Sequence, residues 1–80
     1  MKALHMKKGK WETTILSDVG YEHLVAEISL NGQFLLLLDR ERGRDAVHIA
    51  FPEKDGKLTS PVPLVEFIEQ LQAASENLCR

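Results

Sequence analysis

The sequence has little of what small domains use to reinforce a core. It contains one cysteine, Cys79, among 80 residues. An internal disulfide and a cysteine-rich zinc site are therefore both excluded. Secreted domains of this size are usually held together by disulfides, so a reducing compartment is favoured, and we predict a cytoplasmic location.

Long apolar segments and an excess of positive charge are also missing. The longest aliphatic run, Leu35 to Leu38, is too short to cross a bilayer, and the N-terminus has no apolar region of the kind a signal peptide needs. We therefore expect no membrane partner. Ten Lys and Arg against twelve Asp and Glu give a net charge of −2, which excludes a chain that is basic overall.

The charge is unevenly distributed along the chain. Residues 1–10 carry four lysines and no acid, a net charge of +4, which leaves −6 for residues 11–80. The hydrophobic content of 44% and charged content of 28% are ordinary for a globular domain. We predict a basic, flexible arm over residues 1–9 and a single domain over residues 10–80.

Alternating and β-rich segments predict four strands, at residues 10–16, 23–30, 33–39 and 46–51. The dipeptide Asn31-Gly32 lies between two of them and predicts a two-residue hairpin, because both residues of that turn need positive φ. A second two-residue turn is expected at Arg42-Gly43.

A helix is predicted over about residues 62–78. Pro63 suits a first helical turn, where the N–H that it lacks would have no partner. Apolar residues recur on one face of this segment at helical spacing, with Glu66 and Glu69 among the polar residues opposite. The fold class that follows is α+β: a four-stranded antiparallel meander and then one helix, ββββα.

The two predicted turns fix a strand register, and that register gives the sheet two apolar faces. It places Ile28 opposite Leu35, Leu36 opposite Ile49, and Leu38 opposite Val47. The first face is predicted to carry Val25, Phe34, Leu36, Leu38, Val47, Ile49 and Phe51. The second is richer in alanine and has room for the helix; it is predicted to carry Leu24, Ala26, Ile28, Leu30, Leu35, Leu37, Ala46, His48 and Ala50.

One helix can cover only one of these two faces. Leaving the first face in water would forfeit on the order of 5–10 kcal/mol, comparable to the whole stability of a small domain. Three coverings remain open: the sheet curls so that Trp11, Ile15 and residues 52–62 fold over, a second copy packs on it, or a different protein binds. The first face is therefore the predicted interface.

Residues with catalytic or metal-binding chemistry are scattered. No metal-binding motif joins His5, His23 and His48, and Cys79 near a helix C-terminus is at the wrong end of the dipole for a stabilised thiolate. In the predicted register His23 meets the charged turn at residues 40–45. We predict that the chain is not an enzyme and uses no metal or other cofactor.

A different class of function is open as an alternative. The chain could bind single-stranded nucleic acid through basic side chains and a stacking tryptophan, although the acidic body disfavours it. The residues predicted for that role are Lys7, Lys8, Lys10, Trp11, Arg40, Arg42 and Arg44.

The order of elements, four strands and then a helix, resembles that of the single-strand-binding transcriptional coactivators, and it also looks like that of small accessory domains and toxin-neutralising immunity proteins. The resemblance is one of architecture and covers no sequence motif; for the coactivators it implies dimerisation through such elements. The favoured prediction is a non-catalytic protein-interaction module that acts as a homodimer through the uncovered face, with another protein as the other possible partner.

Overall fold

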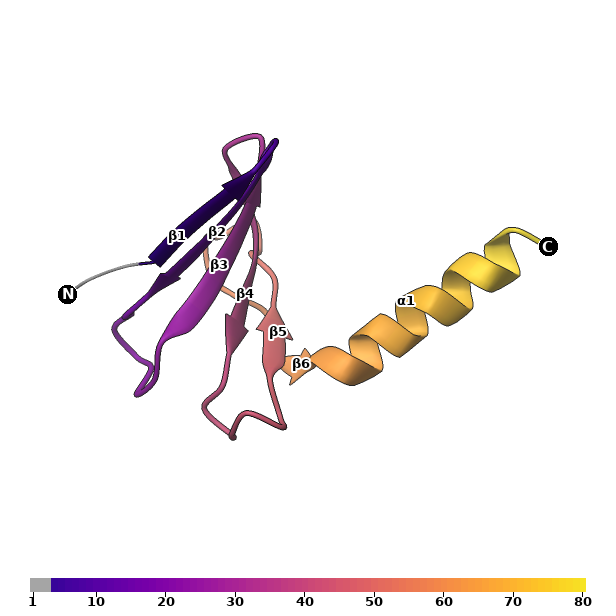
Figure 1. The fold of residues 1–80 in the computed structure, drawn as a ribbon. Coiled ribbons are helices and arrows are strands. Elements are labelled where there is room, and N and C mark those ends of the chain that lie inside the picture. The colour runs from indigo at the N-terminus through magenta and orange to yellow at the C-terminus, as the bar shows by residue number, and fades with distance from the viewer. Residues whose placement is uncertain (1–3) are drawn as a thin grey trace.

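Six antiparallel strands form one sheet in the order of the sequence, and a single helix follows them (Figure 1). The computed structural model describes residues 4–80. Its elements are β1 (Leu4–Lys8), β2 (Trp11–Leu16), β3 (Val25–Leu30), β4 (Gln33–Asp39), β5 (His48–Ala50), β6 (Val62–Pro63) and α1 (Leu64–Leu78). The α+β class and the antiparallel meander agree with the sequence prediction, but the sheet has six strands where four were expected.

The two additional strands lie at the edges of the sheet. Residues 4–8, which were expected in the basic arm, pair with β2 as strand β1. Residues 1–3 of that arm lie outside the described residues. At the other edge, Val62–Pro63 pairs with β5 before the helix begins, so α1 starts two residues later than predicted. A proline at a sheet edge costs nothing in the ladder, since the N–H it lacks would not be bonded there.

The predicted hairpin between β3 and β4 is confirmed. Asn31 and Gly32 have φ values of +54° and +80°, the left-handed conformation that this two-residue turn needs at both positions. Next to the turn, Leu30 pairs with Gln33, as predicted.

Beyond the hairpin the predicted register is wrong by one residue. A β-bulge lies between the Ser29–Phe34 pair and the next pair, in which Ile28 faces Leu36 instead of Leu35. Leu35 is thus the additional residue on β4. A bulge of this kind changes which residues of the two strands share a face.

The turn predicted at Arg42-Gly43 is also wrong. The last paired residues of β4 and β5 are Asp39 and His48, so residues 40–47 form an eight-residue connection. As a result Leu38 pairs with Ile49, not with Val47. The pairing is shifted by two residues relative to the prediction. Because this number is even, residues of β4 and β5 that were predicted to share a face of the sheet still do so.

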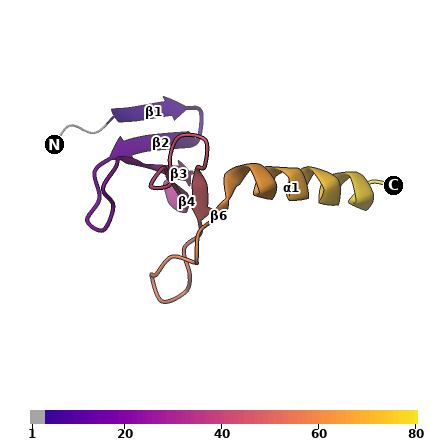
Figure 2. The ribbon, with the colours of Figure 1, turned by 90° about the horizontal axis from the view of Figure 1, so that it is seen from below.

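The helix extends away from the sheet instead of covering it (Figures 1 and 2). No residue of α1 is buried. The sequence prediction placed α1 over the alanine-rich face, and this is not observed.

The resulting shape is open for a chain of this size. The radius of gyration is 13.9 Å and the longest extent is 48 Å, whereas a compact domain of this length has a radius of about 12 Å. The accessible surface is 6424 Å², against about 4,900 Å² for a compact monomer of the same mass. About 1,500 Å² more surface is therefore exposed than a closed fold would leave.

Candidate interaction surface

One face of the sheet collects most of its large apolar side chains. We call it face A and define it by the paired residues that share it across all six strands. Its members are Leu4, Met6, Lys8, Trp11, Thr13, Ile15, Ala26, Ile28, Leu30, Gln33, Leu36, Leu38, Ile49 and Val62. The bulge creates this composition, because it brings Ile28 and Ala26 onto the same side as Leu36 and Leu38.

Much of face A is open to water. At the β1–β2 edge, Leu4 is 56%, Met6 49% and Trp11 50% exposed, and Val62 is 39% exposed at the other edge. Ile49, on β5 next to that second edge, is buried. The exposed apolar area thus lies at both ends of the face, with a better-packed strip between them.

A hollow of about 370 Å³ opens at the end of face A where β2 and β4 finish and β3 begins. Its lining includes Ile15, Ala26 and Leu38, together with the neighbouring Leu24 and Val47, and most of the exposed lining is apolar. Such a hollow accepts an apolar side chain from a binding partner.

The opposite face of the sheet has a different character, with polar and charged side chains on β1, β2 and β3. They are His5, Lys7, Glu12, Thr14, Glu27 and Ser29. His5 and Glu12 are in contact there, with 2.8 Å between the imidazole Nε2 and a carboxylate oxygen. The sheet therefore has one apolar face and one mixed face, and the prediction of two apolar faces is wrong.

The small core lies at the far end of that mixed face. Val25, Leu37 and Ala50 are each at most 2% exposed. Asp39 is buried beside them, and its carboxylate accepts a hydrogen bond of 3.1 Å from the backbone N–H of Glu41.

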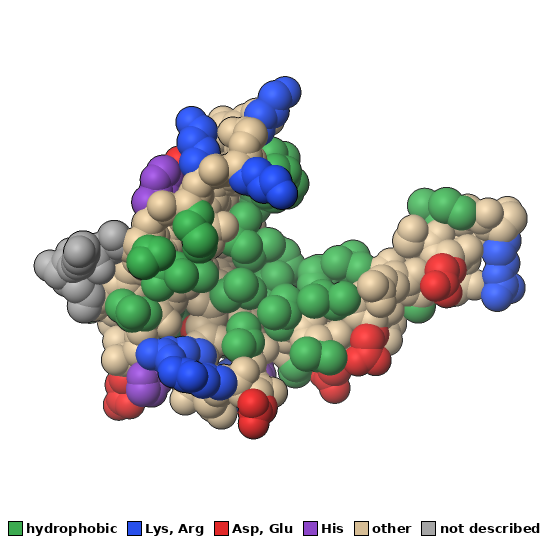
Figure 3. Space-filling view, in the orientation of Figure 1, with side chains coloured by type: hydrophobic (Ala, Val, Ile, Leu, Met, Phe, Trp, Pro, Cys, Tyr) green, Lys and Arg blue, Asp and Glu red, His purple; other side chains and the backbone are tan. Residues whose placement is uncertain are grey.

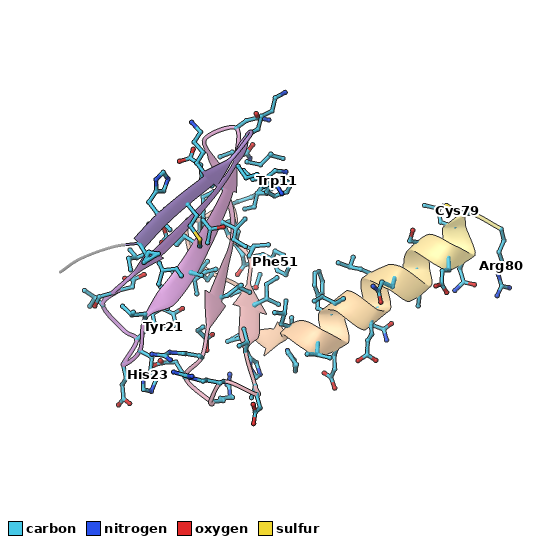
Figure 4. All side chains as sticks on the ribbon, viewed as in Figure 1. Trp11, Tyr21, His23, Phe51, Cys79 and Arg80 are labelled. Atoms are coloured by element: carbon cyan, nitrogen blue, oxygen red, sulfur yellow. The ribbon has the colours of Figure 1, made fainter. Side chains whose placement is uncertain are left out.

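The helix presents a second apolar surface next to face A. Ile68 is 43%, Leu71 54% and Leu78 84% exposed. Only the first turns are anchored, because the Phe67 ring lies 5.2 Å from that of Phe51. Figure 4 shows Trp11 and Phe51 on the side of the sheet from which α1 extends, and Figure 3 shows hydrophobic side chains continuing from the sheet onto the helix.

Charged side chains surround the apolar surface of face A and α1, with acids on the helix and basic residues at the ends of the sheet. The helix carries Glu66, Glu69 and Glu76 and no Lys or Arg. Basic side chains gather at both ends of the sheet patch in Figure 3. One end is the β1–β2 turn with Lys8 and Lys10, and the other is the connection after β4.

A carboxylate fastens the loop between β2 and β3 to the connection after β4. The two Glu41 carboxylate oxygens accept hydrogen bonds from the backbone N–H groups of Glu22, at 2.7 Å, and His23, at 3.0 Å. These two bonds, that from Glu22 first, hold the pKa of Glu41 below its ordinary value. His23 does meet the charged turn, as predicted, but its partner is Glu41.

Tyr21 lies in the same loop region. Burial, followed by the negative charges of Asp39, Asp18 and Glu41, raises the pKa of its phenol. The phenol is thus neutral throughout the physiological range.

Three of the seven residues predicted for the interface, Leu36, Leu38 and Ile49, are paired members of face A. Val47 lines the hollow, and the Phe51 ring packs against Phe67 of the helix. Two are placed elsewhere: Val25 lies in the buried core of the mixed face, and Phe34 pairs with Ser29 on that same side.

Sequence reasoning missed the outer part of the surface. Leu4 and Met6 were assigned to the arm, although their alternation with His5 and Lys7 is a strand signal. Trp11 was considered only for packing or base stacking, and it is a central member of the exposed edge.

The residues predicted for nucleic-acid binding are not brought together. Lys7, Lys8, Lys10 and Trp11 lie at the end of the sheet that also holds the Asn31-Gly32 turn, since the N–H of Asn31 donates to the carbonyl of Lys10. Arg40, Arg42 and Arg44 follow the opposite end of β4. The seven residues of β4 separate the two clusters, a distance of roughly 20 Å.

Other features of the described residues add no site of a different kind. Within residues 4–80, no three His, Cys, Asp or Glu side chains are grouped so that they could hold a metal ion. Over the same residues, no helix is long and apolar enough to cross a membrane.

Comparisons of the chain with protein-family models, with curated proteins and with solved structures found no match. Face A, the helix and their surroundings are therefore the features from which a function can be inferred.

Proposed function

We propose that this chain is a non-catalytic protein-interaction module that acts as a homodimer through face A. The observation that carries the proposal is the exposed apolar surface of face A and the adjoining helix, on a chain with about 1,500 Å² more accessible area than a compact monomer. Exposed apolar side chains gathered on one surface are typical of protein–protein contacts.

The size of the excess favours a permanent contact over a transient one. If each copy buried this area, the interface would total about 3,000 Å², within the range of obligate homodimers. A reducing compartment such as the cytoplasm suits the proposal, because Cys79 is an exposed free thiol.

Two substitutions on β1 test the proposal with matched charge. Met6→Glu puts a carboxylate on face A, and Lys7→Gln changes the charge by the same amount on the opposite face. Met6 is already 49% exposed, so its substitution leaves the fold of one copy intact. In sedimentation velocity, Met6→Glu should shift the chain to monomer while Lys7→Gln stays dimeric.

The outcomes separate the candidate partners. If the unsubstituted chain is a monomer at all concentrations, self-association is refuted. If it is a dimer that both variants leave unchanged, face A is not the contact.

A further inference from the structure

Helix α1 lacks the contacts that a helix of its length needs. It has 15 residues, none of them buried, and its N-cap residue Pro63 makes no side-chain capping bond. Isolated helices shorter than about 12–15 residues are marginal in water. The apolar face of α1 beyond Phe67 therefore needs a surface to pack on.

The chain's own sheet does not supply that surface in this structure. Strand β6 is hydrogen-bonded to β5, and α1 begins at the very next residue, Leu64. The N–H of Leu64 donates to the carbonyl of Val47 at 2.9 Å. With no linker between strand and helix, the direction of α1 is set by β6, and it leads away from face A.

We propose that each copy in the dimer lays its helix α1 across face A of the other copy. This inference rests on the proposed dimer and specifies what covers face A within it. The arrangement is reciprocal, as a two-fold axis requires, so each copy gives one helix and receives one.

The dimensions of the two surfaces agree. The 15 residues of α1 span about 22 Å. Six strands at their usual spacing span about 24 Å. A helix from the second copy is thus long enough to cover nearly the whole width from the Val62 edge of the sheet to the Leu4 edge.

The charges agree as well. The incoming helix carries three glutamates and no basic residue. Face A is bordered by Lys8 and Lys10 at one end; at the other, the connection after β4 carries three arginines with the acids Glu41 and Asp45 among them. Opposite charges around an apolar centre favour this orientation of a second copy over an unrelated basic partner.

The lone cysteine gives a direct test with the intact chain. Cys79 is exposed and directly follows α1, at the end of the molecule remote from β1 (Figure 4). A nitroxide label on Cys79 of one copy is mixed with an unlabelled, ¹⁵N-enriched copy, so that any broadening of ¹⁵N amide signals arises between copies. Exchange of helices predicts broadening within β1–β4 of the enriched copy.

Four results would overturn the exchange. Broadening confined to the helix indicates that two helices pair with each other. No broadening in a sample of dimeric mass indicates sheet-to-sheet contact, which refutes the exchange while the proposed dimer stands. Broadening that appears only in a second sample, in which label and ¹⁵N are on the same chain, indicates that α1 folds onto its own sheet. A monomeric mass refutes both proposals.

A pair of helix variants provides the second readout. Leu71→Glu and Gln72→Glu each add one negative charge at exposed neighbouring positions, but only Leu71 is on the apolar face of α1. We expect Leu71→Glu to weaken dimerisation at least tenfold and Gln72→Glu to change it less than threefold. A dimer that tolerates Leu71→Glu, yet is broken by Met6→Glu, would contradict the exchange alone.

Discussion

Replacing Trp11 with alanine should weaken the dimer more than any other single truncation on the β1–β2 edge. Trp11 is 50% exposed in one copy, on the face that we propose is covered. A fully buried aromatic side chain covers 150–250 Å², so dimerisation can remove about 100 Å² of Trp11 surface from water.

The expected magnitude follows from that area. At about 25 cal/mol per Å², the loss is about 2.5 kcal/mol for each copy. A symmetric dimer contains the contact twice, which gives about 5 kcal/mol, or a dissociation constant roughly 4,000-fold higher.

The assay is a dilution series followed by sedimentation velocity under reducing conditions, which keep Cys79 from cross-linking two chains. Val19→Ala is the control, because Val19 is 98% exposed but lies outside the strands of face A. The reasoning is refuted if Trp11→Ala raises the dissociation constant less than tenfold, or if Val19→Ala has an equal effect.

Three further predictions concern the fold and its reporters. Leu37→Ala should lower the free energy of unfolding by about 2–5 kcal/mol in chemical denaturation, because Leu37 is 1% exposed; a loss below 1 kcal/mol would contradict its place in the core. The pKa of Glu41 is lowered, so the hydrogen bonds that its carboxylate accepts from the N–H groups of Glu22 and His23 (the loop clamp) should be fully present above the ordinary glutamate pKa. They should be lost as pH falls through the lowered pKa. Fast amide exchange of Glu22 and His23 in Glu41→Gln at neutral pH, measured by NMR, would confirm the clamp, and unchanged exchange would contradict it. Trp11 is the single tryptophan, so its fluorescence emission should shift to shorter wavelength as protein concentration rises; emission that stays constant across the dimerisation range would count against its burial.

The sequence was sufficient for the elements whose signals are local. Asn31-Gly32 identified the central hairpin because few other residue pairs adopt positive φ twice in succession. The 3.6-residue spacing located α1 within two residues of its true start.

The predicted strand register was wrong where polar and apolar residues do not alternate in the sequence. Phe34 to Leu38 are all apolar, so a shift by one residue buries no polar group and the pattern cannot distinguish the two pairings. The bulge at Leu35 decides which side chains form face A, and alternation alone does not reveal it. Val25 and Phe34 were assigned to the wrong face for this reason.

The direction in which α1 extends could not be predicted from the periodicity of its apolar residues. An amphipathic pattern shows that one face of α1 needs a partner surface, but not whether that surface belongs to the same chain. The sequence prediction assumed that the partner surface belonged to the same chain, and it therefore placed α1 over the sheet. The direct passage from Pro63 in β6 to Leu64 in α1 directs the helix away from it instead.

The mass of the unsubstituted protein in solution shows directly whether two copies associate. Light scattering behind size-exclusion chromatography, in reducing buffer, should give about 18 kDa, twice the 9.0 kDa of one chain. A mass of 9.0 kDa at every concentration would show that a single copy leaves face A and its helix exposed, and the proposed dimer would be abandoned.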